Sequence, residues 1–154
     1  MSALYDEDFY SWTREQADLL RRAGEQRSNT PSGLDWEHLA LQVWELGLSL
    51  ELQLYNRYVV LIAHLLKWRY QPRLQGGSWR GTVNEQRRRI ARVLRKNPAL
   101  KTVREDEFTE AYEDARELAA DDSGLPIETF PPTCPFTTAQ VEDKEFWPGT
   151  EVRP

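Results

Sequence analysis

The sequence predicts an all-α protein, a single-domain bundle of about four helices around a long central second helix. Apolar residues recur at helical spacing in four segments, and capping and stop residues mark the ends of those segments. A proline-rich, mostly irregular segment follows the fourth helix. A chain of 154 residues suits one domain and is long enough to bury a core without disulfides or metals.

The first helix is expected over about residues 6–24. Asp6 is a suitable N-cap, and the two acids after it complement the positive end of the helix dipole. Phe9 and Trp12 begin an apolar stripe at helical spacing. Gly24 follows the stripe, as a C-terminal stop does.

The second helix is expected over residues 35–71, with Asp35 as N-cap and Pro72 as the residue that ends it. Residues 46–54 alternate as a strand does, but at 100° per residue the segment gains two nearly opposite apolar faces, which favours a helix. A helix that is apolar on two sides must be covered on two sides, by its own chain or by another subunit. One face holds Leu39, Val43, Leu46, Leu50, Leu54 and Leu61, and the other holds Leu41, Trp44, Leu48, Leu52, Tyr55, Val59, Ile62 and Leu66.

Two further helices of opposite charge are expected. The third covers residues 78–96, with Ser78 as N-cap and with arginines that face away from its apolar stripe. The fourth covers residues 98–123, between Asn97-Pro98 and Gly124, and its outer side is acidic. Residues 125–154 hold too many large apolar side chains for a free tail, so we expect them to pack on the bundle.

The charge is sorted along the chain. Residues 67–104 hold 12 of the 20 Lys and Arg but only one acid, Glu85. A polyanion site is one interpretation, and pairing with the acidic fourth helix is the other. Pairing together with ordinary solvation is favoured, because a net charge of −5 disfavours nucleic-acid binding unless the acids are segregated from the basic patch. The candidate polyanion-binding residues are Arg80, Arg88, Arg92, Arg95 and Lys96.

Motifs for catalysis are missing from the sequence. The two histidines are 26 residues apart, and no metal-ligand spacing or glycine-rich phosphate loop occurs. Cys134 stands alone between prolines. The sequence therefore predicts no catalytic residue, no metal and no cofactor. The most apolar run spans nine residues and no signal peptide is recognised, so we expect a soluble cytoplasmic protein that does not bind membranes.

The segment "HLLKWRYQP" (64–72) crowds polar and aromatic side chains at the end of the second helix. They could meet residues of the third helix around a pocket, as in an enzyme centred on His64 and Arg87, or they could lock two helices together. The lock is favoured. The cluster comprises His64, Lys67, Trp68, Gln71, Trp79, Gln86 and Arg87.

Several blocks of sequence carry a family resemblance: "YDEDFYSWTREQADLLR", "HLLKWRYQP", "SWRGTVNEQRRRI", "NPAL", "AYEDARELAADDSGLP" and "FPPTCPF". From about Tyr5 to Trp147 the chain resembles the bacterial domain-of-unknown-function family number 29. The resemblance implies an all-helical bacterial domain and no particular activity. The family pattern falls on Trp12, Asp35, His64, Leu65, Leu66, Lys67, Trp68, Gln71, Pro72, Ser78, Trp79, Gln86, Arg87, Pro98, Tyr112, Ala115, Gly124 and Cys134.

The second helix departs from the family pattern. An acidic pair and a basic residue of that pattern stand where this chain has Leu41-Gln42 and Leu48, so one apolar face is enlarged. We therefore expect Leu41, Trp44, Leu48 and Leu52 to form a homodimer interface. The functional prediction is a non-enzymatic protein-interaction module that self-associates, with its protein partner otherwise unknown.

Overall fold

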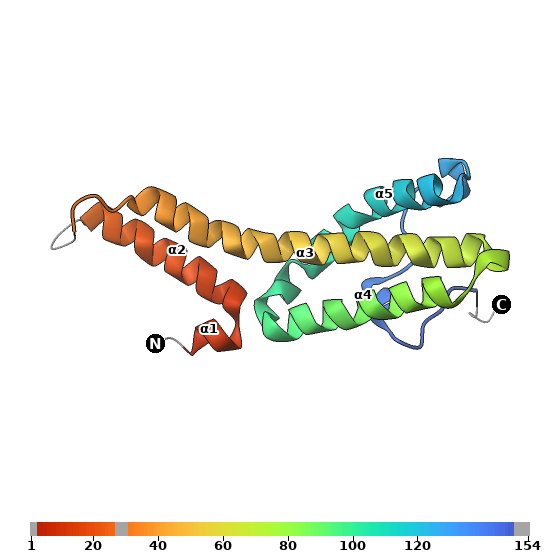
Figure 1. Ribbon diagram of the computed structural model, residues 1–154, viewed down its shortest axis with the longest axis horizontal. Coiled ribbons are helices and arrows are strands. Elements are labelled where there is room, and N and C mark those ends of the chain that lie inside the picture. Colours follow the sequence, from red (N-terminus) through yellow and green to blue (C-terminus); the bar gives the residue numbers. More distant parts are fainter. Residues whose placement is uncertain (1–2, 27–30, 150–154) are drawn as a thin grey trace.

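The computed structural model describes residues 3–26 and 31–149, and these residues form helices and no strands (Figure 1). The all-α class and the four long helices are confirmed. The last five residues of the predicted C-terminal segment lie outside the described residues. The helices are α1 (Leu4–Glu7), α2 (Phe9–Gln26), α3 (Trp36–Tyr70), α4 (Gly77–Lys96), α5 (Arg104–Ser123) and α6 (Thr138–Glu142).

Helix α3 holds the fold together. Asp35 caps it by accepting a hydrogen bond from the backbone N–H of His38 at 3.2 Å, and it ends at Tyr70, two residues before Pro72. Its 35 residues span about 52 Å. Residues 46–54 lie inside this helix, so the preference for helix over strand is confirmed.

Two regions share α3. Figure 1 shows α5 on one side of its second half and α4 on the other, while α2 returns along its first half. We call α2 with residues 36–52 of α3 the arm. We call residues 53–70 of α3, with α4, α5 and the C-terminal segment 125–149, the body.

The body contains most of the core. Leu61 and Leu65 of α3 are completely buried, and so is Phe130 of the C-terminal segment. The packing of that segment on the bundle is therefore confirmed. Further buried apolar residues of this core are Leu54, Tyr58, Ile62, Ala63, Leu66, Val83, Ile90, Leu94, Leu100, Phe108, Ala111, Tyr112, Ala115, Ala119, Phe136 and Val141.

The first helix differs from its prediction at both ends. Asp8 interrupts it and Asp6 does not cap it, because Asp8 accepts hydrogen bonds from the backbone N–H groups of Ser11 at 3.0 Å and Ala99 at 2.8 Å. Gly24 does not stop the helix, which continues to Gln26. Its lack of a side chain serves close helix packing instead, as described below.

The starts of the third and fourth helices also differ from their predictions. Helix α4 begins at Gly77, one residue before the expected cap Ser78. Residues 98–102 form a 3₁₀ turn, and α5 begins only at Arg104. The Asn97 side chain does not cap this turn, because it accepts from Tyr10 N–H and donates to the Val93 carbonyl, each at 3.1 Å. Gly124 ends α5 with φ 70°, as predicted.

Candidate functional site

Apolar side chains are exposed mainly on the arm and at its free end. Nine large apolar side chains of the described residues stand out as exposed, and seven belong to this part of the molecule. The other two are Tyr5 and Leu74. The chain therefore leaves much of the apolar surface of the arm uncovered. The seven are Leu19, Leu34, Leu39, Leu41, Leu46, Leu48 and Leu52.

The exposed leucines of α3 form two lines. Leu41, Leu48 and Leu52 are seven and four residues apart, so they share one side of the helix, and they are 46%, 40% and 57% exposed. Leu39 and Leu46 lie roughly 160° away around the helix. We call these the first and the second leucine line. Helix α2 packs between them and covers neither line.

Helix α2 approaches α3 closely through two glycines. A Cβ atom on Gly24 would lie 2.6 Å from the Cβ of Trp36, and one on Gly47 would lie 2.5 Å from the Oγ1 of Thr13. Neither contact leaves room for a methyl group. The close approach makes the arm a compact helical hairpin.

Arg14 braces the arm at its base. Its Nη2 lies 3.3 Å from Oε1 of Glu51, and its guanidinium lies 4.8 Å from the ring centre of Tyr10 and 4.3 Å from that of Trp44. The hydroxyl of Tyr10 donates to the same carboxylate. Trp44 is therefore half-buried against α2, unlike the other three predicted interface residues, which are exposed.

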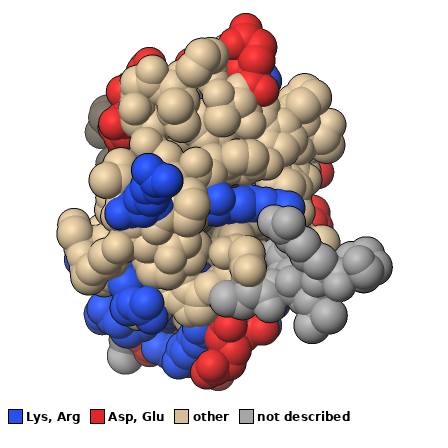
Figure 2. Space-filling view, turned by 90° about the vertical axis from the view of Figure 1, so that its right-hand side faces the viewer, with Lys and Arg blue, Asp and Glu red and all other residues tan. Residues whose placement is uncertain are grey.

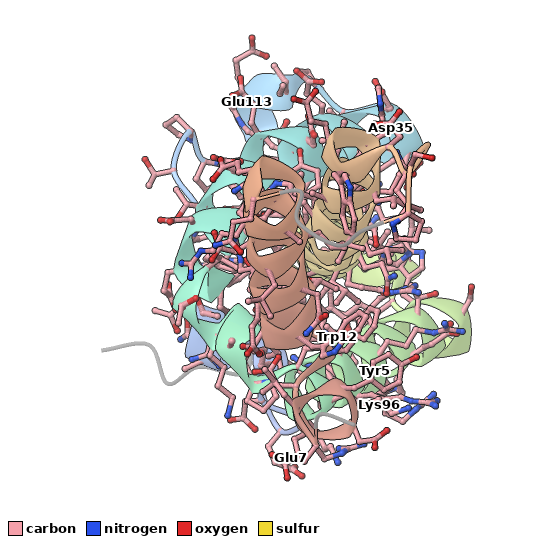
Figure 3. The ribbon with its side chains drawn as sticks, turned by 90° about the vertical axis from the view of Figure 1, so that its left-hand side faces the viewer. Tyr5, Glu7, Trp12, Asp35, Lys96 and Glu113 are labelled. Carbon is pink, nitrogen blue, oxygen red and sulfur yellow. The ribbon has the colours of Figure 1, made fainter. Side chains whose placement is uncertain are left out.

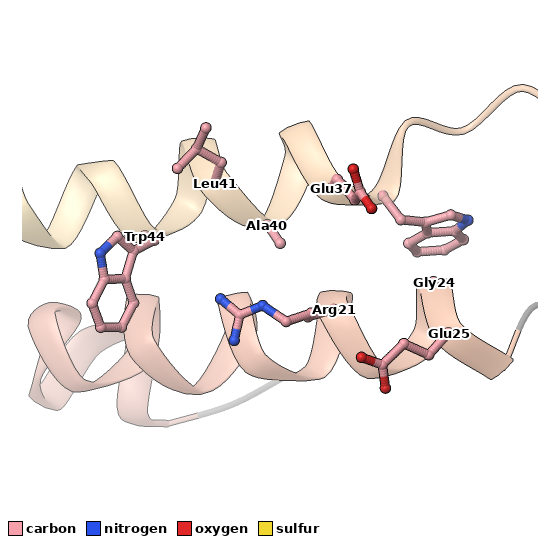
Figure 4. A pocket seen from close by; sticks show the side chains of 8 residues that line it. Arg21, Gly24, Glu25, Glu37, Ala40, Leu41 and Trp44 are labelled. Carbon is pink, nitrogen blue, oxygen red and sulfur yellow. The ribbon is translucent and has the colours of Figure 1, made fainter.

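A groove of about 970 Å³ opens between α2 and α3 near the free end of the arm (Figure 4). Its apolar lining includes Trp36, Ala40 and Trp44. Leu41 lines the groove and also begins the first leucine line, so the two form one continuous apolar surface. The remaining lining residues are Arg21, Gly24, Glu25 and Glu37.

The structure brings part of the "HLLKWRYQP" cluster together. Lys67 Nζ lies 2.8 Å from Oδ2 of Asp122 on α5 and 5.3 Å from the ring centre of Trp79 on α4. The rings of Trp68 and Trp147 are 4.5 Å apart. These contacts join α3 to α4, to α5 and to the C-terminal segment. No local pattern marks Asp122 and Trp147 as partners, because both are far from this cluster along the chain.

Arg87 fastens the C-terminal segment to α4. It is 3% exposed, and it donates from Nε to the Val141 carbonyl and from Nη2 to the Phe146 carbonyl, both at 2.7 Å. Burial lowers the pKa of its guanidinium, and no carboxylate of the described chain lies within 4.0 Å of it. Its hydrogen-bonding groups are therefore used mainly to hold backbone.

The remaining cluster residues stay apart from these contacts. His64 Nδ1 lies 2.9 Å from the Val60 carbonyl of its own helix, and burial lowers the pKa of the imidazole. Gln71 follows the end of α3, and its backbone N–H donates a hydrogen bond to the carbonyl of Lys67. Gln86 is buried in α4. None of these residues lines either groove described in this section.

The predicted pairing of the basic and acidic helices is wrong. In the described residues, no ion pair within 4.0 Å joins α4 to α5. The reason is topological, because α3 lies between them (Figure 1). Figure 2 shows acidic side chains at the top, where α5 ends in Figure 1, and basic side chains across the middle and lower left.

A second groove, of about 700 Å³, follows α4 where it packs against α3. Arg88, Arg92 and Lys96 of the predicted polyanion set line it, and Arg57 of α3 joins them. Arg80 instead lies over the rings of Trp68 and Trp147, and Arg95 is exposed outside the groove lining. Sequence analysis missed Arg57, which is distant from the basic segment along the chain. Other lining residues are Leu50, Gln53, Glu85, Arg89, Val93 and Asn97.

Features of metal sites and of membrane spans are absent from the described part of the chain. It contains no group of three or more His, Cys, Asp and Glu arranged to hold a metal ion. It also contains no helix with the length and apolarity needed to cross a membrane. Cys134 is half-buried, and burial raises the pKa of its thiol, which disfavours the reactive thiolate.

Comparison with known proteins identifies the family and the fold. None of the curated proteins compared with the chain matches it. A crystal structure of an α-helical protein of unknown function from Rhodospirillum rubrum is similar, with a TM-score of 0.73 and 18% identity, over 95% of this chain and 93% of that one. The family model described as "Domain of unknown function DUF29" matches residues 4–147, so the chain belongs to that family.

Proposed function

We propose that this protein is a protein-interaction module that self-associates through its arm. The interface consists of the first leucine line and the groove that continues it at the free end. The observation that supports the proposal is the concentration of exposed leucines on one helical hairpin. Contiguous exposed apolar surface of this kind marks interaction sites on soluble proteins.

A second copy of the chain suits this surface. A hairpin of two helices is half of a four-helix bundle, and a second hairpin supplies the two missing helices. The strip of α3 between the leucine lines carries Gln42, Ser49, Gln53 and Asn56 and one acid, Glu45, so it offers little charge to a highly charged partner. A two-fold axis would bring the same leucines of both copies together, as the commonest homodimers do.

The test is the mass of the protein in solution as a function of concentration. We expect a dimer at ~100 µM that dissociates on dilution. Leu48→Glu with Leu52→Glu should give a monomer with an unchanged helical circular dichroism spectrum, because both side chains are exposed in the single chain. The matched control is Leu74→Glu, at a residue that is 60% exposed but distant from the arm, and it should leave the dimer intact. A monomeric wild-type mass at ~100 µM contradicts the proposal.

A further inference from the structure

We propose that the groove between α3 and α4 binds the phosphate backbone of duplex nucleic acid, independently of the self-association of the arm. Five cationic side chains and one acid, Glu85, line this groove. They come from both helices, so the fold itself collects the positive charge. The five are Arg57, Arg88, Arg89, Arg92 and Lys96.

Most of these charges have no partner of opposite sign in the protein. Arg89 Nη2 lies 2.8 Å from Glu85 Oε1 of the same helix. The other four cations have no carboxylate within 4.0 Å in the described residues. Arg88, Arg92 and Lys96 follow one another at intervals of four residues, an arrangement of like charges that destabilises an isolated helix. A bound anion relieves that repulsion.

The acid-rich second half of α5 lies away from the groove. A net charge of −5 opposes the approach of a polyanion only if the acids surround its site. Helix α5 carries nine acids, and it begins near the end of α4 and crosses α3, so that its second half lies on the other side of α3 from α4. Figure 3, viewed from the arm end, places Glu113 of α5 and Lys96 of α4 at opposite corners of the molecule. The fold therefore separates part of its acidic charge from the groove, which favours the approach of a polyanion to an acidic protein.

The lining of the groove favours phosphates over bases. It includes no aromatic side chain, so it lacks the stacking surface that single-stranded nucleic acids use. Arginine suits phosphate oxygens because its guanidinium donates two parallel hydrogen bonds. The cations of α4 are about 6 Å apart along the helix, which lets them contact successive phosphates. Such contacts bind duplexes without reading their sequence.

The experiment measures binding of a labelled DNA duplex of mixed sequence by fluorescence anisotropy at several salt concentrations. With four phosphates contacted, affinity should fall about 10²-fold between ~50 and ~200 mM salt. The variant Arg57→Gln/Arg88→Gln/Arg92→Gln should bind at least about tenfold more weakly, with a salt slope reduced by about 3. Its solution mass should stay that of the wild type, which separates this test from that of the arm.

The matched control removes the same charge elsewhere. Arg69→Gln/Arg73→Gln/Lys144→Gln alters three exposed residues outside the groove and should retain wild-type binding. An equal loss of binding in the two triple variants would overturn the proposal, since net charge alone would then explain binding. The absence of duplex binding at ~50 mM salt would overturn it as well. So would equal competition by a single-stranded oligonucleotide or by polyglutamate at matched charge.

Discussion

Along α3 the arm and the body have the same two-sided apolar pattern and cover it differently. In the body, α4, α5 and the C-terminal segment enclose the helix, and Leu54, Leu61 and Leu65 are completely buried. In the arm α2 is the main cover of α3, and both leucine lines stay exposed. The apolar pattern of the sequence therefore indicates how much of the surface of a helix must be buried. The ends of α4 and α5 decide how much of that cover comes from the same chain.

The polar contacts of the two regions differ as well. Contacts of buried cationic side chains hold the body, as Lys67 with the exposed Asp122 and Arg87 with two carbonyls show. The arm depends on close backbone approach at two glycines, with Arg14 as a brace at its base. Substitutions in the two regions test this contrast.

Truncation of a core leucine should have the largest effect. Leu61→Ala should lower the free energy of unfolding by about 2–5 kcal/mol, because it removes a completely buried side chain and leaves a cavity. Leu74→Ala is the control, with an expected change within about 0.5 kcal/mol. Urea unfolding followed by circular dichroism measures both. Equal effects would show that the body is not the stable part of the molecule.

Removal of Arg87 should release the C-terminal segment. Arg87→Met leaves the carbonyls of Val141 and Phe146 without their donors, at a cost of about 3 kcal/mol. Amide hydrogen exchange should rise across residues 126–147 before it rises in α3. The adjacent exposed residue gives the control, Arg88→Met, with an expected change within about 0.5 kcal/mol. Unchanged exchange in the segment would contradict the role of Arg87.

A methyl group at the helix contacts of the arm should destabilise it. Gly24→Ala and Gly47→Ala should each cost about 1–3 kcal/mol by overpacking. Gly24→Ala should cost more, because its neighbour is the rigid Cβ of Trp36 and not a hydroxyl. Gly81→Ala is the control in α4, where a Cβ meets no atom within 4 Å, and it should stabilise by up to about 1 kcal/mol. Thermal unfolding ranks the three variants, and a stabilised Gly24→Ala protein would disprove the close packing.

His64 should give the smallest effect, a dependence of stability on pH. Burial, helped by the charge of Lys67, lowers its pKa in the folded state below 6.5. The contribution of the neutral His64 imidazole to the free energy of unfolding is therefore complete above pH 6.5, and it is lost as the pH falls through the folded pKa. Unfolding measured from neutral to acidic pH should show this loss in the wild type. The same series on His64→Gln should lack it, and identical curves would contradict the assignment.

Local signals predicted the long elements well and failed where distant residues intervene. The limits of α3 were predictable, because the residues that mark them, Asp35 and Pro72, lie next to its ends in the sequence. At the break in the first helix, the Asp8 side chain accepts a hydrogen bond from the backbone N–H of Ala99. Just before the 3₁₀ turn, the Asn97 side chain accepts one from the backbone N–H of Tyr10. Neither contact is visible in a local pattern.

The candidate site was predictable only as a pattern. Helical spacing placed Leu41, Leu48 and Leu52 on one face, but exposure depends on where the neighbouring helices end. Trp44 has the same spacing, yet Arg14 of another helix holds it. The expected pairing of α4 with α5 failed for a related reason, since adjacency in the sequence did not make them neighbours in space. Arg57 joined the basic groove only through the fold.

The continuity of α3 restricts how its length can change. One inserted residue near the boundary of arm and body would rotate the arm by about 100° relative to the body. The leucine lines would then no longer continue the faces that α4 and α5 cover. An insertion of seven residues rotates the arm by only about 20°, and one of eleven by about the same amount in the opposite sense. Relatives that keep both regions in this relation should therefore differ in the length of this helix by such steps and not by single residues.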